Sequence, residues 1–182
     1  SIGARRDGKA VPRLTQLLSA PDQQVASATA VALGRIGTPP AGQALEAALA
    51  NTRADTRPAV IEGSLNCAET LAADGQKDQA LRLFGRLGSA KMPVHIRESA
   101  LRGTLLASRP RNLPLLIEQL HSPDLPTFRV GLWVLQRELP GPDVTRTVAA
   151  ELNKLRPERS VLLLEALGGR GDASAVPAMS AA

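Results

Sequence analysis

The sequence predicts an all-α fold, a right-handed α-solenoid of about five helix pairs, from three observations. The first is an internal repeat of 33 to 34 residues. The second is the recurrence of apolar residues at helical spacing, without the period-two alternation that is typical of strands. The third is the placement of the prolines, which fall between the apolar segments or in their first turns, where a helix tolerates them.

The repeat is visible as identical residues at fixed offsets. Six residues of the segment 3–12 recur 165 positions later, in the segment 168–177, and 165 is five times 33. Five residues of the segment 12–22 recur 102 positions later, in the segment 114–124, and 102 is three times 34. Because two independent offsets give one period, we expect stacked units that bury a shared core.

Each period contains two apolar helical patterns separated by a turn, such as the one at Pro21 and Asp22. The expected first helices are 8–19, 40–51, 76–88, 111–121 and 142–155. The expected second helices are 23–36, 57–73, 94–108, 125–139 and 158–168. The whole chain is expected to form one array whose units are 8–37, 38–75, 76–109, 110–140 and 141–171, with 172–182 starting a sixth.

The composition bounds the class of protein. With 43% apolar residues the chain is too hydrophobic for a disordered protein, and no apolar run approaches the ~20 residues that cross a bilayer, so no membrane insertion is expected. The net charge is +5, with 18 Arg and 4 Lys, which permits an acidic partner. Cys67 is the lone cysteine, so it forms no internal disulfide and leaves the compartment open.

The residues that could carry chemistry are few. Cys67 is interpreted as a small core residue, and His95 and His121 as solvated side chains in separate loops. Two histidines and one buried thiol do not make a metal site, because metal binding needs converging ligands. Glu62 and Glu69 lie two helical turns apart, but an open helical face gives little burial to raise a carboxyl pKa. We therefore expect no catalysis, no metal and no cofactor.

The exposed stripe of the second helices is the most informative surface. Core positions are expected at Val25, Val60, Ile96 and Phe128 and at their +4 and +7 neighbours, so the opposite face lies at +2, +6 and +9. This face has mixed charge and several apolar members. It is expected to consist of Ser27, Val31, Gly34, Glu62, Asn66, Glu69, Glu98, Arg102, Leu105, Val130, Val134 and Arg137.

Several short motifs resemble HEAT-like repeats, above all the bacterial type known from phycobilin lyases. They are Asp22-Gln23-Gln24-Val25, Ala32-Leu33-Gly34-Arg35-Ile36-Gly37, His95-Ile96-Arg97-Glu98-Ser99-Ala100-Leu101 and Ala166-Leu167-Gly168. The resemblance covers nearly the whole chain, although 75–87 looks more like a tetratricopeptide helix. It implies that second helices line the concave face. It also implies a ladder between units formed by Asp22, Asp124, Arg97 and Arg129.

The hypothesis favoured by these patterns is a non-catalytic scaffold that binds a protein or peptide. Its expected contact residues are Glu62, Asn66, Glu69, Glu98, Arg102, Val130, Val134 and Arg137. Trp133 is interpreted as a core residue, with an interface role as the alternative. One alternative function is nucleic-acid binding through an edge formed by Arg5, Arg35, Arg137 and Arg170. The other is bilin-lyase-like activity, which the resemblance alone suggests.

Both ends of the sequence look cut. The chain opens like the tail of a second helix and closes with a first helix that lacks its partner. Because solenoid ends normally carry a polar capping unit, we expect a segment of a larger bacterial protein.

Overall fold

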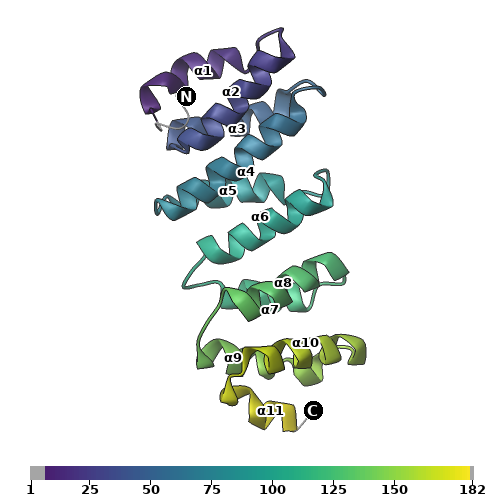
Figure 1. Cartoon of the computed structure of the whole chain (residues 1–182). Coiled ribbons are helices and arrows are strands. Elements are labelled where there is room, and N and C mark those ends of the chain that lie inside the picture. The colour runs from purple at the N-terminus through teal and green to yellow at the C-terminus, as the bar shows by residue number, and fades with distance from the viewer. Residues whose placement is uncertain (1–6, 181–182) are drawn as a thin grey trace. The chain divides into compact units, whose positions relative to one another are not determined.

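The computed structural model describes residues 7–180, and within that range it is helical without any strand (Figure 1). The chain divides into two compact units, Ser1–Ser108 and Arg109–Ala182. The division falls at the predicted end of the third repeat unit. The all-α, solenoid-type fold predicted from the period is confirmed.

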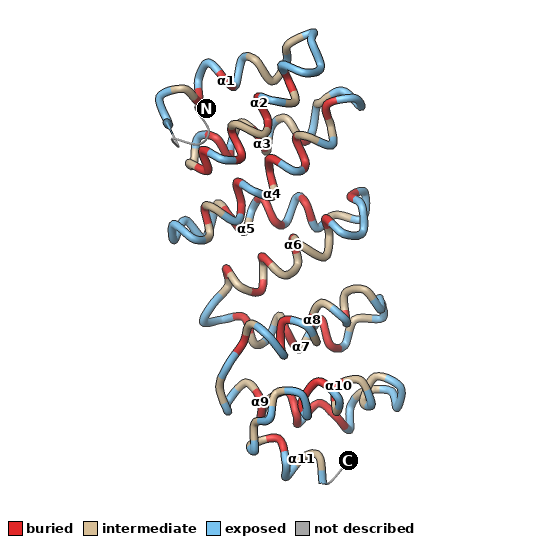
Figure 2. The backbone as a smooth tube through the Cα atoms, viewed as in Figure 1, coloured by how far each residue is buried: buried red, intermediate tan, exposed pale blue. Residues whose placement is uncertain are grey.

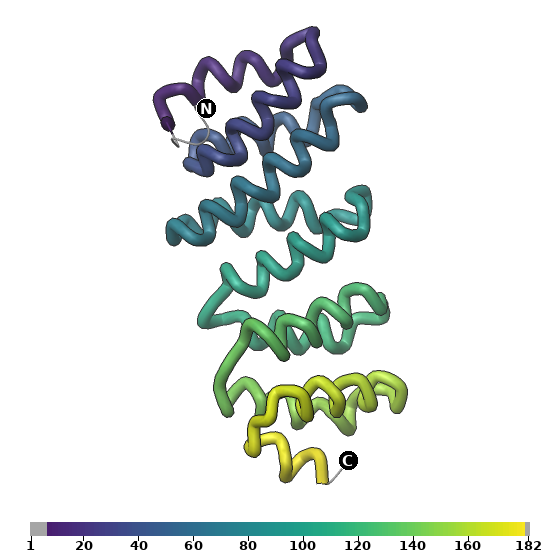
Figure 3. Tube along the Cα trace, viewed as in Figure 1, coloured from purple at the N-terminus to yellow at the C-terminus, as the bar shows by residue number. Residues whose placement is uncertain are grey.

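The first unit contains three helix pairs after a short 3-10 helix, η2 (Gly8–Ala10). The helices are α1 (Val11–Leu17), α2 (Gln23–Ile36), α3 (Pro39–Asn51), α4 (Arg57–Ala73), α5 (Lys77–Leu87) and α6 (Val94–Ala107). First helices pack on first helices, α1 on α3 and α3 on α5, and second helices pack on second helices, α2 on α4 and α4 on α6. Figure 3 shows the chain advancing pair by pair through this unit. This nearest-neighbour stacking is the solenoid arrangement that the period predicts.

The second unit follows the same plan with shorter elements. They are α7 (Leu113–Leu120), α8 (Leu125–Arg137), α9 (Pro142–Ala149), η3 (Leu152–Lys154), α10 (Pro157–Arg170), η4 (Ala173–Ala175) and α11 (Val176–Ser180). The helix predicted over 142–155 is wrong in its second half. It ends at Ala149, because the chain turns there to bury Leu152 in the core and then forms a 3-10 turn.

Aspartates and glycines set the helix boundaries. The carboxylate of Asp22 accepts hydrogen bonds from the backbone N–H groups of Gln24 and Val25 and so caps α2. Asp124 caps α8 through Thr127 in the same way. Gly37 ends α2 at φ 60°, a left-handed conformation in which glycine avoids the strain of a side chain. Aspartate and glycine therefore recur along the chain because they begin and end its helices.

The core of each unit lies between its two helical layers, where Figure 2 shows the buried positions. The largest fully buried side chains of the first unit are Leu33, Ile36, Leu45, Leu71, Leu83, Phe84, Leu87 and Leu105. Those of the second unit are Leu116, Leu120, Phe128 and Leu135. Because every pair contributes one apolar side, burial depends on the neighbouring pair.

The register of two second helices differs from the prediction by one residue. In α2, Val25 is 40% exposed and Ala26 is buried, so Ala26 occupies the position that Val60 holds in α4. In α8, buried Phe128 corresponds to Ile61 rather than to Val60. One residue turns a helical face by 100°, so the face opposite the core changes in both helices.

Candidate protein-binding surface

The outward face of α4 is where the sequence predicts it. Glu62, Asn66 and Glu69 are exposed, whereas Ile61 and Cys67 are buried on the other side of the helix. Among the described residues, the carboxylates of Glu62 and Glu69 take part in no hydrogen bond or ion pair. We call Glu62, Asn66 and Glu69 the α4 row. It presents two solvated negative charges on either side of an amide.

The corresponding face of α2 is formed by other residues than predicted. Gly34 is buried and not on the surface, because α2 meets α4 there. Ser27 and Val31 are half-buried, and the exposed residues of α2 beyond its first turn are Ala28 and Arg35 instead.

The α6 members of the predicted stripe are only partly accessible. Glu98 and Arg102 are half-buried, and Leu105 is fully buried. Leu105 is therefore a core residue and does not lie on the predicted face.

The α8 members need the largest correction. Val134 has no exposed surface and Val130 is half-buried, so Val134 is a core residue and cannot contact a partner. Arg137 is exposed as predicted. The outward side of α8 is formed by Arg129, Trp133 and Arg137, which we call the α8 row.

Trp133 lies on the surface, 43% exposed, and the interpretation of this residue as core is wrong. The corrected register places it at the position of Asn66 in α4. The sequence signal that could have given this register is Gly131. It is a small residue at a close contact between two helices, and it corresponds to the small residue Ser64 in α4.

The ladder between repeat units uses other residues than the resemblance implies. The guanidinium of Arg53 donates to the carbonyl oxygens of Ala20 and Pro21, which belong to the turn of the preceding pair. Arg159 donates likewise to the carbonyl oxygens of Ser122 and Pro123 and lies over the ring of Phe128. These two arginines therefore connect successive turns.

The four predicted ladder residues have different surroundings. Asp22 and Asp124 are helix caps, as described above. Arg129 is exposed in the α8 row, and the Nε atom of Arg97 is buried without a hydrogen-bond partner among the described residues. The prediction selects the right turns but the wrong arginines. Arg53 lies before α4 begins, and Arg159 lies two residues after the start of α10.

A comparison with known protein families matches HEAT repeats over residues 1–66. The matched segment contains α1, α2, α3 and most of α4, and the same pairing of helices continues beyond it. Residues 1–66 are HEAT repeats, and the chain has a HEAT-like repeat fold. No curated protein matches its sequence significantly. A bacterial origin and a phycobilin-lyase type stay predictions.

The lone cysteine and one of the two histidines of this HEAT-like repeat protein lie in different surroundings. Cys67 is fully buried, and burial raises the pKa of its thiol to about 12. His121 is exposed, and its Nε2 lies 2.7 Å from Oε2 of Glu151, whose other carboxylate oxygen accepts a hydrogen bond from Lys154. Across residues 7–180, His, Cys, Asp and Glu form no group of three that could hold a metal ion.

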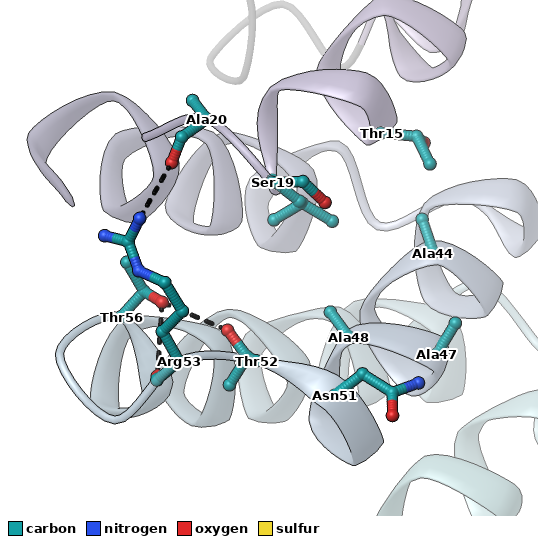
Figure 4. Close-up of a pocket in the computed structure, with 11 residues that line it drawn as sticks. Thr15, Ser19, Ala20, Ala44, Ala47, Ala48, Asn51, Thr52, Arg53 and Thr56 are labelled. Carbon is teal, nitrogen blue, oxygen red and sulfur yellow. Dashed lines mark hydrogen bonds between the residues drawn. The ribbon is translucent and has the colours of Figure 1, made fainter. Parts of the chain in front are cut away.

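A hollow of about 360 Å³ lies between α1 and α3 of the HEAT-like array. Figure 4 shows Ala44, Ala47 and Ala48 along its α3 side, with Arg53 spanning one end to reach Ala20. The guanidinium of Arg53 is already bonded to backbone carbonyls and to Asp55. The hollow is therefore a gap between the two first helices, lined mostly by alanine, serine and threonine.

The helices of the described segment are too short or too polar to span a membrane.

Proposed function

We propose that this HEAT-like repeat protein is a non-catalytic scaffold that binds a protein or peptide on the outward face of its second helices. HEAT repeats commonly mediate protein–protein interaction. The observation that supports the proposal most directly is the α4 row, whose charged groups are solvated and unpaired within the described chain. Groups of this kind can be paired by a partner without first breaking internal contacts.

The nucleic-acid alternative is less well supported. It needs a set of accessible arginines along one edge, because affinity for a polyanion comes from phosphate contacts. Arg170 donates instead to Thr145 and to the backbone of Leu135, and its burial lowers the pKa of its guanidinium. Arg5 lies outside the described residues. Bilin-lyase-like activity keeps only the support of the family resemblance.

The proposal is tested by comparing partners captured by two variants of equal charge change. Glu62→Gln with Glu69→Gln removes two negative charges from the α4 row. Gln43→Lys with Asn51→Lys adds two positive charges on exposed positions of α3, on the first-helix side. Each variant therefore raises the net charge by two.

A protein that wild type and the α3 variant retain, and that the α4 variant loses, is the expected result. Circular dichroism checks that both variants keep the wild-type helix content. If every retained protein binds the α4 variant as tightly as wild type, the α4 row is not a binding surface.

A further inference from the structure

The α8 row carries a more specific arrangement than the α4 row. Arg129, Trp133 and Arg137 follow one another at intervals of four residues, so their positions advance by about 6 Å along one side of the helix. An exposed tryptophan between two arginines combines the residue types that dominate binding energy at protein interfaces. The second unit thus has an aromatic anchor flanked by positive charge.

The neighbouring helix α10 ends in two glycines that lie beside the last turn of α8. Buried Gly131, Val134 and Leu135 of α8 correspond to Leu163, Ala166 and Leu167 of α10, so Trp133 is matched by Glu165 and Arg137 by Gly169. In agreement with that register, a Cβ on Gly169 would lie 3.3 Å from Nε2 of Gln136. A Cβ on Gly168 would meet no atom within 4 Å.

The end of α10 therefore presents bare backbone where a side chain could have covered the surface next to the α8 row. An apolar side chain of a partner can contact the indole itself, because Trp133 is 43% exposed. Burying exposed apolar surface of this kind is the main favourable term in association.

Charge decides which partner fits. The α8 row has two cations and no anion, so a carboxylate on each side of the partner's apolar side chain would be attracted. Glu165 of α10 has the opposite effect, because it repels a carboxylate placed over α10. The two helices together select a segment whose negative charges lie along α8 alone.

We propose that the α8 row binds an acidic segment of a partner protein, in which one apolar side chain lies between two carboxylates spaced about 6 Å from it. An extended peptide meets this spacing with the pattern Glu-x-Leu-x-Glu, because alternate residues share a face and are about 6.6 Å apart. The inference rests on the proposed function and deepens it by naming the partner chemistry for the second unit.

The single tryptophan makes the test direct, since the chain has one Trp and no Tyr. The ¹H–¹⁵N resonance of the Trp133 indole is followed while the peptide Glu-Ser-Leu-Ser-Glu is added to the whole chain. Two control peptides are Lys-Ser-Leu-Ser-Lys, with reversed charge, and Glu-Ser-Ser-Ser-Glu, without the apolar centre. A saturable shift with the first peptide alone is expected at about 1 mM or below.

The variants identify the contacts. Arg129→Glu with Arg137→Glu is expected to weaken binding at least about tenfold, because like charges then face each other. The control is the single charge reversal Arg146→Glu, at an exposed arginine of α9 that pairs with Asp143 on the same helix, and it is expected to bind like wild type.

The proposal is overturned if the indole resonance does not move, or if it moves equally with all three peptides. It is also overturned if the α8 and α9 variants lose binding to the same extent. The Glu62→Gln and Glu69→Gln variant is expected to bind the peptide normally. Peptide binding by this variant therefore reports on the α8 row alone, so a wrong α8 proposal can be told apart from a wrong α4 proposal.

Discussion

Gly34 and Gly63 bring α2 and α4 into backbone contact. A Cβ on Gly34 would lie 2.6 Å from the carbonyl oxygen of Gly63, and a Cβ on Gly63 would collide with the carbonyl oxygen of Ala30. Neither clash can be relieved by turning a side chain, because both involve backbone atoms. The close approach of these two second helices therefore requires that neither residue has a Cβ atom.

Gly63→Ala is expected to destabilise the first unit by about 1–3 kcal/mol, the usual cost of overpacking a dense core. Gly85→Ala is the matched control, since Gly85 also lies in a helix but a methyl group added to it would meet no atom within 4 Å. It is expected to stabilise the protein by ~0.5 kcal/mol, because alanine loses less backbone entropy. Urea unfolding measures both, and equal effects would contradict the close contact.

Glu151 connects the turn after α7 to the turn after α9. Burial raises the pKa of its carboxyl, but hydrogen bonds and attraction from Lys154 and His121 outweigh burial, so the pKa lies below the ordinary 4.5. A lowered pKa in the folded state means that the pairing adds stability above about pH 4.5. That contribution is lost as the pH falls through the lowered value.

Replacing Glu151 with Gln is expected to lower the free energy of unfolding at pH 7 and to flatten its pH dependence below about pH 5. The measurement is thermal or urea unfolding across a pH series. Glu118→Gln, at an exposed position of α7, serves as the control and should leave the pH profile unchanged. A Glu151 variant with the wild-type profile would show that the pairing contributes nothing.

At the scale of elements, arginines that cap the turn of the preceding pair connect the helix pairs. Arg159 donates to two carbonyl oxygens that the preceding turn leaves without helical partners, with 2.8 Å between its Nη2 and the Pro123 oxygen. Its planar guanidinium reaches both at once and also lies 4.5 Å from the ring centroid of Phe128.

Arg159→Leu is expected to destabilise the second unit by about 1–3 kcal/mol, because its charged hydrogen bonds to the turn carbonyls are lost while an apolar stem is kept. Arg156→Leu, three residues earlier and exposed, should change stability by less than about 0.5 kcal/mol. Urea unfolding of both variants gives the two changes in the free energy of unfolding. A larger change for Arg159→Leu is the expected sign that this arginine connects the helix pairs. If Arg159→Leu leaves the free energy of unfolding unchanged, this arginine does not contribute to the interaction between pairs.

The repeat period and the turns predict most helix bounds, because Asp caps, glycine ends and first-turn prolines are local signals. The faces of α2 and α8 could not be predicted in the same way. The sequence pattern matches Val25 and Phe128 to Val60 as the first large apolar residue of each helix, yet small residues such as Ala26 and Gly131 occupy the closest contacts. Packing between helices, not apolar content alone, sets the register, and so it decides whether Trp133 or Val134 reaches the surface.

At the scale of the whole molecule, the two compact units each have a core that can be probed separately. Cys67 is the only cysteine and is fully buried in the first unit, with a thiol pKa raised to about 12 by burial. A thiol reagent therefore reaches it only when that unit opens.

Leu45→Ala in the first unit is expected to cost about 2–5 kcal/mol and to raise the alkylation rate of Cys67 by at least about 30-fold. Leu167→Ala, equally buried in the second unit, is expected to raise that rate much less. The check is alkylation of the native protein followed by mass spectrometry. Equal acceleration by both changes would show that the whole chain opens as one unit.

The measurement that tests the assignment of faces most directly is acrylamide quenching of Trp133 fluorescence in the native protein. The α8 row depends on a register in which Trp133 is exposed while Val134 is buried. The predicted result is red-shifted emission and clear quenching, weaker than in the urea-unfolded chain because 43% of the residue is exposed. Blue-shifted emission that acrylamide hardly quenches would place the indole in the core, and both the α8 row and the corrected register would then be wrong.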